Sequence, residues 1–182
     1  MRQVTPVTPF TGTVRRVTIH SSDPFATPED LRSPVRRLRG RLPSPVTLWT
    51  APGPAGLTVS SAEIVDGDPG RLVGLLDEES ELWAAASAAG RFLVMPLGAE
   101  DRQLADRFAG LLPAPGGLFV NGDWHGTQWG PVLAGRGTWA GCRVDGARPF
   151  GWSLLVEATI EHIEIGANEP PLLHYRGRYH AL

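Results

Sequence analysis

From Pro45 to the C-terminus, short runs of Val, Leu, Thr and Trp are separated by glycine and proline, and this pattern restricts the fold more than any other feature. Runs of about four to eight such residues between turn-forming residues are typical of β-strands. The 22 glycines and 17 prolines supply the turns. Because no regular crossover helices separate the strands, the pattern favours an antiparallel barrel with two or three peripheral helices over a doubly wound sheet.

The predicted elements follow from apolar periodicity and from their start and stop residues. A helix is expected from Glu81 to Ala89, because Ser80 is a good N-cap and Gly90 a good terminator. A second helix is expected from about Ala99 to Phe108. Strands are expected at Val46–Thr50, Gly56–Ser60, Arg71–Leu76, Arg91–Pro96, Thr138–Asp145, Ser153–Ile165 and Leu172–Tyr175. The segment with Trp124, His125 and Trp129 is expected to be a loop, which either packs across the surface of the barrel or covers the functional site.

Residues 1–26 are expected to form an N-terminal arm, with residues 12–19 as a possible edge strand, and residues 27–182 to form one domain. Thr27 and the following Pro28 predict a helix start, and Ser33–Pro34 predicts a restart. Arginines at positions 32, 36, 37, 39 and 41 make this segment basic. Two interpretations stay open for them, a solvated helix face and a contact with an anion.

Composition excludes several classes of function. The net charge of −2 provides no electrostatic basis for binding nucleic acid or an anionic membrane. All 17 basic residues are arginine. We interpret this composition as a coding bias and not as evidence of a binding function. Cys142 is the single cysteine, so no internal disulfide forms, and no apolar run reaches the roughly 18 residues of a membrane span. We expect a cytoplasmic protein with no membrane segment.

Sequence fingerprints of common enzymes are missing. The run from Gly135 to Gly141 has one residue too many for a dinucleotide-binding loop, and no phosphate loop ends in Gly-Lys-Ser or Gly-Lys-Thr. The five histidines show no pair at the spacing of a helical zinc site, and no serine lies in a nucleophile elbow. We therefore predict no metal site and no hydrolase.

The most informative stretch is Gly56-Leu57-Thr58-Val59-Ser60-Ser61, which places three hydroxyl groups at the end of a predicted strand. One interpretation is an ordinary strand end rich in Thr and Ser. The other is a set of neutral hydrogen-bond donors in a tight bend, which holds a flavin ring edge or a phosphate without lysine.

The order of several motifs resembles that of the flavin reductase family of split-barrel flavin-binding proteins, from about Arg37 to the C-terminus. The residues that carry the resemblance are Leu42-Pro43-Ser44-Pro45-Val46-Thr47, Gly56 to Ser61, Leu75-Leu76-Asp77 with Ser80, Gly90-Arg91-Phe92, Leu104 to Gly110, and Tyr175-Arg176-Gly177-Arg178-Tyr179-His180. This resemblance implies a six-stranded antiparallel Greek-key split barrel, a homodimer, and a flavin held noncovalently near the subunit interface.

The resemblance also implies roles for individual residues. Thr58, Val59, Ser60 and Ser61 would contact the isoalloxazine edge or the ribityl-phosphate chain. Further flavin contacts are implied for Asp77, Ser80, Arg91, Phe92 and Tyr179. His180, in the terminal motif, is the candidate for proton exchange at the flavin.

Two departures from the family pattern affect the mechanism. Many members carry a Gly-Asp-His motif, whereas this chain has Phe150-Gly151-Trp152, so that Trp152 occupies the place of the histidine. Trp152 could stack on a nicotinamide or flavin ring, or it could be a core residue of the barrel. Glu78 and Glu79 lie in the loop expected to face a flavin phosphate, where repulsion results unless both side chains point to solvent.

The implied activity is hydride transfer from NADH or NADPH to FMN or FAD, with reduced flavin passed to a partner such as a monooxygenase. One alternative keeps the fold and the flavin but uses another electron donor, or acts as a flavin carrier. A second alternative is a dimeric interaction module that has lost the flavin.

Overall fold

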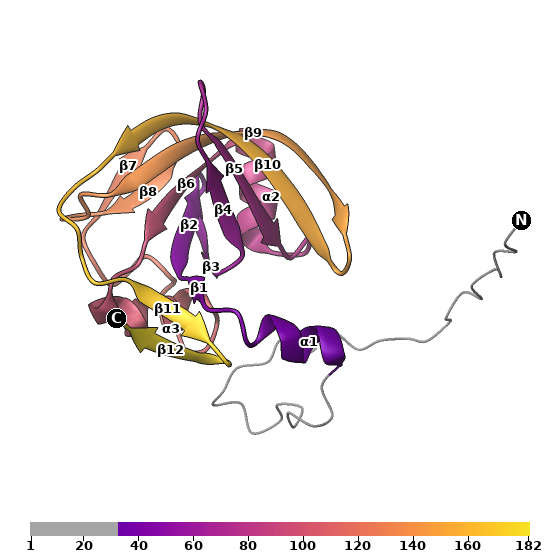
Figure 1. The fold of residues 1–182 in the computed structure, drawn as a ribbon. Coiled ribbons are helices and arrows are strands. Elements are labelled where there is room, and N and C mark those ends of the chain that lie inside the picture. The colour runs from indigo at the N-terminus through magenta and orange to yellow at the C-terminus, as the bar shows by residue number, and fades with distance from the viewer. Residues whose placement is uncertain (1–32) are drawn as a thin grey trace, which may run out of the picture.

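The computed structural model describes residues 33–182, and its largest element is a curled antiparallel sheet of seven strands (Figure 1). In their order across the sheet the strands are β3 (Ala55–Val59), β2 (Thr47–Ala51), β6 (Arg91–Pro96), β9 (Trp139–Phe150), β10 (Ser153–Glu164), β5 (Arg71–Leu76) and β4 (Ala62–Val65). The sheet curls because twisted antiparallel strands accumulate a right-handed rotation. Its two long strands, β9 and β10, form a hairpin of 12 residues on each side.

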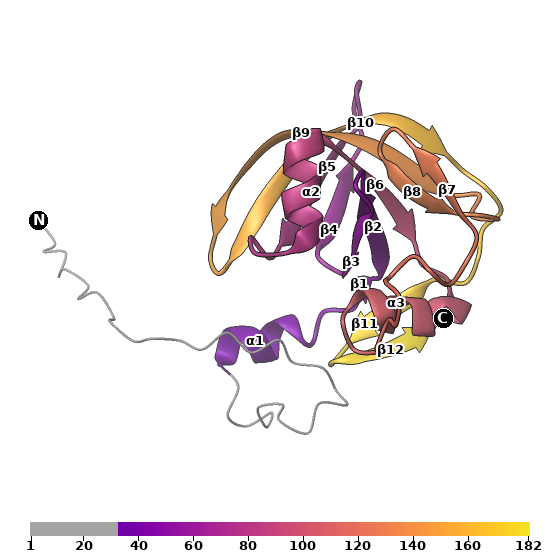
Figure 2. The same cartoon turned by 180° about the vertical axis from the view of Figure 1, so that it is seen from behind.

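Helix α2 (Glu81–Ala89) packs against β2, β3 and β6 (Figure 2). It begins where the Ser80 side chain accepts a hydrogen bond from the backbone N–H of Trp83, and it ends at Gly90, whose φ of 67° is left-handed. Leu82 and Ala86 are its buried residues. The local signals in the sequence therefore determine both ends of this helix.

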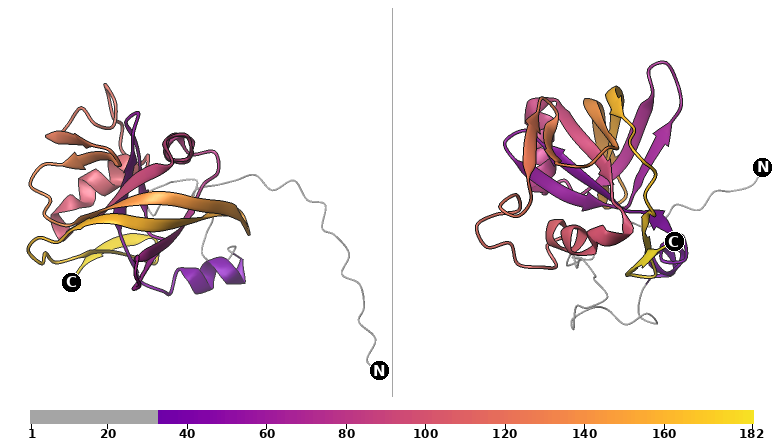
Figure 3. Two further views of the ribbon diagram at one scale, coloured as in Figure 1. Left: turned by 90° about the horizontal axis from the view of Figure 1, so that it is seen from above. Right: turned by 90° about the vertical axis from the view of Figure 1, so that its left-hand side faces the viewer.

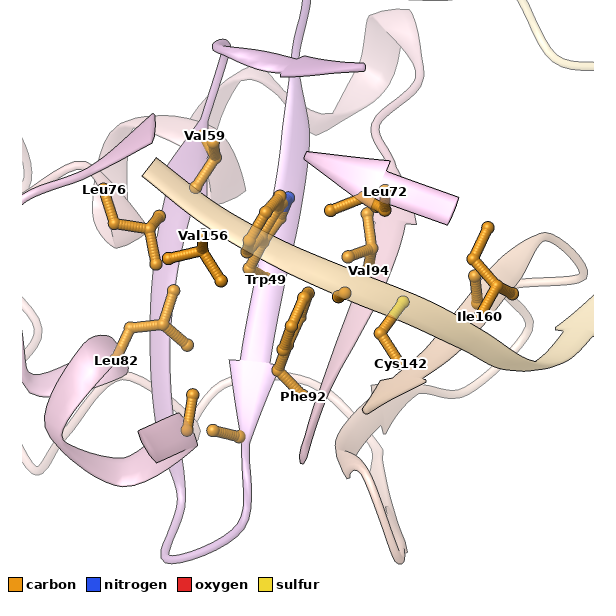
Figure 4. Packing of buried hydrophobic residues seen from close by; sticks show 14 of the residues in the cluster. Trp49, Val59, Leu72, Leu76, Leu82, Phe92, Val94, Cys142, Val156 and Ile160 are labelled. Carbon is orange, nitrogen blue, oxygen red and sulfur yellow. The ribbon is translucent and has the colours of Figure 1, made fainter. Parts of the chain in front are cut away.

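The main core lies between the curled sheet and α2. Figure 4 shows the two largest fully buried side chains of this core, Trp49 and Phe92. Their rings stack with centroids 4.7 Å apart and planes 10° from parallel. Gly74 allows this packing, because a Cβ at that position would lie 2.4 Å from the Trp49 ring. The Trp49 ring therefore stacks on Phe92 of β6 and leaves no room for a side chain at Gly74 of β5.

A second layer packs against the other face of β2 and β6 and carries its own core cluster, which includes Val46, Leu93 and Phe108. Its elements are the three-stranded sheet β1 (Ser44–Pro45), β11 (Leu172–Tyr175) and β12 (Arg178–Ala181), the 3-10 turn η2 (Ala99–Asp101), helix α3 (Arg102–Phe108), and the hairpin of β7 (Trp124–Thr127) and β8 (Gly130–Leu133). Figure 3 gives two further views of the fold. Helix α1 (Pro34–Arg39) lies beside the β11–β12 hairpin, where both line one cavity.

The split-barrel fold class is confirmed, and all seven predicted strands and both central helices are present. Their bounds lie within a few residues of those expected, except that β9 continues past Asp145 to Phe150. The restart at Ser33–Pro34 is also confirmed, because the Ser33 side chain accepts a hydrogen bond from the backbone of Arg36. The main sheet has one strand more than the six expected. This strand, β4, was missed together with β1, β12 and the β7–β8 hairpin. The prediction of a loop around Trp124 is therefore wrong, because the segment forms this hairpin.

The predictions for residues 12–19 and for Thr27–Pro28 lie outside the described residues, and the N-terminal arm stays a prediction. No helix within residues 33–182 is long and apolar enough to cross a membrane.

Candidate functional site

Strand register brings three loops to one end of the sheet. The backbone N–H of Leu75 donates to the carbonyl of Ser61 over 2.9 Å, which places the end of β3 beside the end of β5. On the other side of β5, Leu154 pairs with Leu76, so the β9–β10 turn lies beside Asp77. We call the end of the sheet formed by residues 58–61, 77–80 and 150–153 the barrel mouth.

The hydroxyl groups at the end of β3 hold the mouth together. Thr58 Oγ1 donates to the carbonyl of Ala105 in α3 over 2.8 Å, and Ser61 Oγ donates to the carbonyl of Leu75 over 3.0 Å. The Ser60 side chain is half-buried, whereas Val59 is 4% exposed and belongs to the core. Hydroxyl oxygens keep acceptor lone pairs after donating, so these residues can still accept hydrogen bonds from a ligand.

The Asp77–Ser80 loop is organised by its own polar atoms. Asp77 Oδ1 accepts a hydrogen bond from the backbone N–H of Glu79, and Ser80 Oγ donates to the carbonyl of Asp77 over 2.7 Å. The side chains of Glu78 and Glu79 are exposed to solvent. The loop therefore reaches the mouth without burying a negative charge there.

Trp152 is 79% exposed and follows Gly151, whose φ of 63° makes the tight turn between β9 and β10. An indole with this exposure contributes nothing to the barrel core, so the core interpretation of Trp152 is wrong. The neighbouring Phe150 is also exposed, at 51%. Two large aromatic side chains thus project from one side of the mouth.

Arg91 and Phe92 are not brought to the mouth within one chain. Thr47 pairs with both Val59 and Pro96, so the mouth is level with the end of β6, whereas Arg91 is its first residue. Arg91 forms an ion pair of 3.2 Å with Glu161. Phe92 is 1% exposed and lies within the core.

Glu161 is the acceptor of a separate polar cluster near the start of β6. Its carboxylate accepts hydrogen bonds from Trp129 Nε1 over 3.0 Å and from Arg91 Nε over 3.2 Å. The hydrogen bond from Trp129 is the largest cause that lowers the pKa of Glu161, with the Arg91 and Arg143 cations adding to it. Arg91 therefore has a structural role in this chain, as the ion-pair partner of Glu161.

Tyr179 and His180 face opposite sides of β12, because successive side chains of a strand alternate. The Tyr179 ring packs against the second core cluster, and burial together with the Asp106 carboxylate raises its pKa to about 12. His180 is exposed, and its ring lies 5.9 Å from that of Tyr175 in an edge contact. The terminal motif therefore has one structural residue and one accessible residue.

A cavity of about 380 Å³ lies between α1 and the β11–β12 hairpin. Its lining residues are Arg36, Arg37, Gly40, Arg41, Tyr175, Arg176, Arg178 and His180, and we call it the arginine pocket. In Figure 1, α1 and the hairpin lie below the curled sheet, on the side of the barrel mouth. The basic run of residues 32–41 and the terminal motif from Tyr175 to His180 were both visible in the sequence, but nothing in it indicated that the two meet at one cavity.

Within residues 33–182, no group of three His, Cys, Asp or Glu side chains is arranged to hold a metal ion. The thiol of Cys142 is buried, and this burial, with the nearby Glu161 carboxylate, raises its pKa to about 12. A thiol with such a pKa is inert as a nucleophile near neutral pH.

A family model described as "Flavin reductase like domain" matches residues 39–182. The chain belongs to the flavin reductase-like domain family. Among its relatives, the chain is 29% identical over 165 residues to FMN reductase (NADH) RutF 1 of Methylorubrum extorquens, covering 88% of this chain and 81% of that protein. It is 29% identical over 129 residues to the reductase subunit HsaB of a flavin-dependent monooxygenase of Mycobacterium tuberculosis, covering 69% and 67%.

Among solved structures of this fold, the nitrilotriacetate monooxygenase component B of Mycobacterium thermoresistibile superimposes with a TM-score of 0.73 and 27% identity, covering 81% of this chain and 84% of that one. The flavin that the flavin reductase-like family implies fits the chemistry of the mouth. Neutral hydroxyl groups suit the ribityl and phosphate oxygens, and the exposed indole of Trp152 offers a flat apolar surface.

Proposed function

We propose that the protein is an NAD(P)H-dependent flavin reductase whose active site is the barrel mouth. The observation that carries this proposal is the meeting of three loops with hydroxyl groups and an exposed indole, in a chain of the flavin reductase-like family. The relative named FMN reductase (NADH) supports NADH as hydride donor. FMN and FAD are both proposed substrates.

When bound, the flavin supplies the hydride-accepting ring, and the chain supplies binding and orientation. Thr58, Ser60 and Ser61 would hold the polar chain or ring edge, with Asp77 and Ser80 on the adjoining loop. Val59 and Phe92 would act from the core by fixing the strands that carry these groups. Because orientation of two reactants contributes much of such a rate enhancement, the rigidity of these loops matters directly.

Trp152 is the proposed residue for stacking on a nicotinamide or flavin ring. Stacking of aromatic rings contributes about 0.5–1.5 kcal/mol, so it can orient a ring but cannot alone provide tight binding. His180 is the proposed site of proton exchange, and its exposed ring faces the arginine pocket. Tyr179 supports the hairpin that carries His180.

A homodimer is part of the proposal, as are a cytoplasmic location and transfer of reduced flavin to a partner monooxygenase. The relative that is the reductase subunit of a flavin-dependent monooxygenase supports such a partner. Exposed apolar side chains at the mouth, Phe150 and Trp152, support coverage by a second subunit or by ligand. Arg91 would contact flavin only through such an arrangement of two chains.

The second candidate function is a flavin carrier or an oxidoreductase with another electron donor. The observation that favours it is Trp152 at the position where many members carry histidine. An indole offers stacking but no titratable proton.

The test is to purify the protein, titrate it with FMN and FAD while recording visible absorption, and follow oxidation of NADH and NADPH. The proposal expects flavin binding and turnover, with Trp152→Ala lowering kcat/KM about tenfold through lost stacking and orientation. Ile165→Ala is the control, because Ile165 is 82% exposed and lies outside the mouth. Flavin binding without turnover would establish the second candidate, and no flavin binding would refute both.

A further inference from the structure

The arginine pocket is a strongly charged cavity. Five of its eight lining residues are arginines, and no acidic side chain is among the lining residues that the structure describes. Because the whole chain has a net charge of −2, five cations at one place are a local concentration and not a general surface property.

In the part of the chain that the structure describes, three of the five pocket arginines keep their charge outside ion pairs. Within residues 33–182, Arg37, Arg41 and Arg178 form no salt bridge, whereas Arg71, Arg91, Arg136, Arg143 and Arg148 each pair with a carboxylate. Guanidinium groups bind phosphate through two parallel hydrogen bonds, so a cluster of them suits a di- or polyphosphate.

The pocket also has an aromatic side. Tyr175 and His180 line it with their rings 5.9 Å apart in an edge contact. A volume of about 380 Å³ exceeds what one phosphate needs and falls in the range of small-molecule sites, about 300–1,000 Å³. A ligand with both a polyphosphate and a flat ring matches these properties.

We propose that the arginine pocket binds the ADP half of a dinucleotide, with the diphosphate on the arginines and the adenine against the ring of Tyr175. The choice of a dinucleotide rests on the proposed function, because both FAD and NAD(P)H carry an ADP half. The pocket lies on the mouth side of the barrel, so the reactive half of the same molecule would extend toward Trp152.

The test uses ADP itself as the probe, measured by titration calorimetry on the full chain. The proposal expects ADP to bind at micromolar to low millimolar concentration, more weakly as salt rises. Arg37→Ala and Arg178→Ala should each weaken ADP binding about tenfold or more, the usual effect of losing a hydrogen bond between charged groups. Arg39→Ala is the matched control, because Arg39 is on the same helix but does not line the pocket.

The dinucleotide that supplies the ADP half is then identified by kinetics. A weaker Kd for FAD in Arg178→Ala, with unchanged KM for NADH, would assign the pocket to the flavin. The reverse result would assign it to the nicotinamide dinucleotide, and tighter binding of 2′,5′-ADP than of ADP would indicate NADPH. In each case FMN, which has no ADP half, should bind the variant as it binds the original protein.

Two results would overturn the pocket assignment: no binding of ADP to the original protein, or equal weakening by Arg39→Ala and Arg37→Ala. Riboflavin, which carries no phosphate, separates this inference from the proposed function. If riboflavin binds and ADP does not, the assignment of the arginine pocket to ADP is refuted, and the proposed flavin site at the barrel mouth is retained. ADP binding in a protein that binds no flavin would support the pocket and refute the reductase.

Discussion

The Thr58 hydroxyl donates a hydrogen bond of 2.8 Å to the carbonyl oxygen of Ala105, and this bond ties the end of β3 to helix α3. It connects the barrel mouth to the second layer of the molecule through a single side chain. The position of the end of β3, and with it the binding of any ligand there, therefore depends on how tightly α3 packs against the sheet.

Replacing Thr58 by valine keeps the shape and removes this hydrogen bond. We expect a loss of about 1 kcal/mol in the free energy of unfolding, the usual contribution of one hydrogen bond, while the Ala105 carbonyl keeps its second donor, the backbone N–H of Ala109. Urea denaturation measures the loss. Thr58→Ser keeps the hydroxyl and should retain most of the stability. Equal stability of Thr58→Val and the original protein would show that the bond contributes nothing.

Gly74→Ala tests the close packing of the core. The added methyl group would lie 2.4 Å from the Trp49 ring, so Trp49 and its stacking partner Phe92 must move. We expect destabilisation of about 1–3 kcal/mol, measured as a lower midpoint of urea denaturation. Gly126→Ala is the matched control in a strand, since its Cβ would meet nothing within 4 Å.

Removing Arg136 tests the ion pair with Asp101. The Asp101 side chain is only 7% exposed, and besides Arg136 it accepts a hydrogen bond of 2.7 Å from the backbone of Gly98. Arg136→Ala leaves this carboxylate without its cation, so we expect about 3 kcal/mol of destabilisation. The double variant that also carries Asp101→Asn should recover part of it. A loss below about 0.5 kcal/mol, typical of exposed pairs, would contradict the assignment.

The raised pKa of Tyr179 predicts a loss of stability at alkaline pH. Its folded pKa of about 12 lies above the ordinary value of 10.0. Between these two values the unfolded chain releases the phenol proton while the folded chain keeps it, so stability falls as pH rises from about 10 to about 12. Tyr179→Phe should show a smaller decline over this range in urea denaturation. Tyr175→Phe serves as the control, and the same decline in Tyr179→Phe and the original protein would contradict the prediction.

The local sequence predicted the elements whose signals are contained within them. Helix α2 has its cap at Ser80 and its left-handed stop at Gly90, and β5 and β6 are short apolar runs next to turn residues. The β7–β8 hairpin was missed because each strand has only 4 residues and both contain glycine, with a proline in β8. Its Trp124 packs against Phe108 and Phe119, contacts that no local pattern reveals.

The sequence indicated that the hydroxyl groups of β3 and the loop at Asp77 belong to the site. The resemblance to the flavin reductase family gave them a role in flavin binding. The sequence could not separate Phe92, which stacks on Trp49, from Trp152, which is exposed, since both are aromatic residues at the border of a strand. Burial depends on which side of the curled sheet a residue faces, and that is set by packing between distant segments.

By itself the sequence determined that the chain forms an antiparallel β structure, because glycine, proline and strand-forming runs act over a few residues. Only the tertiary structure decided that Arg37 and Arg178 face one cavity. These residues are far apart along the chain, and their meeting results from the pairing of β1 with β11, which no local preference encodes.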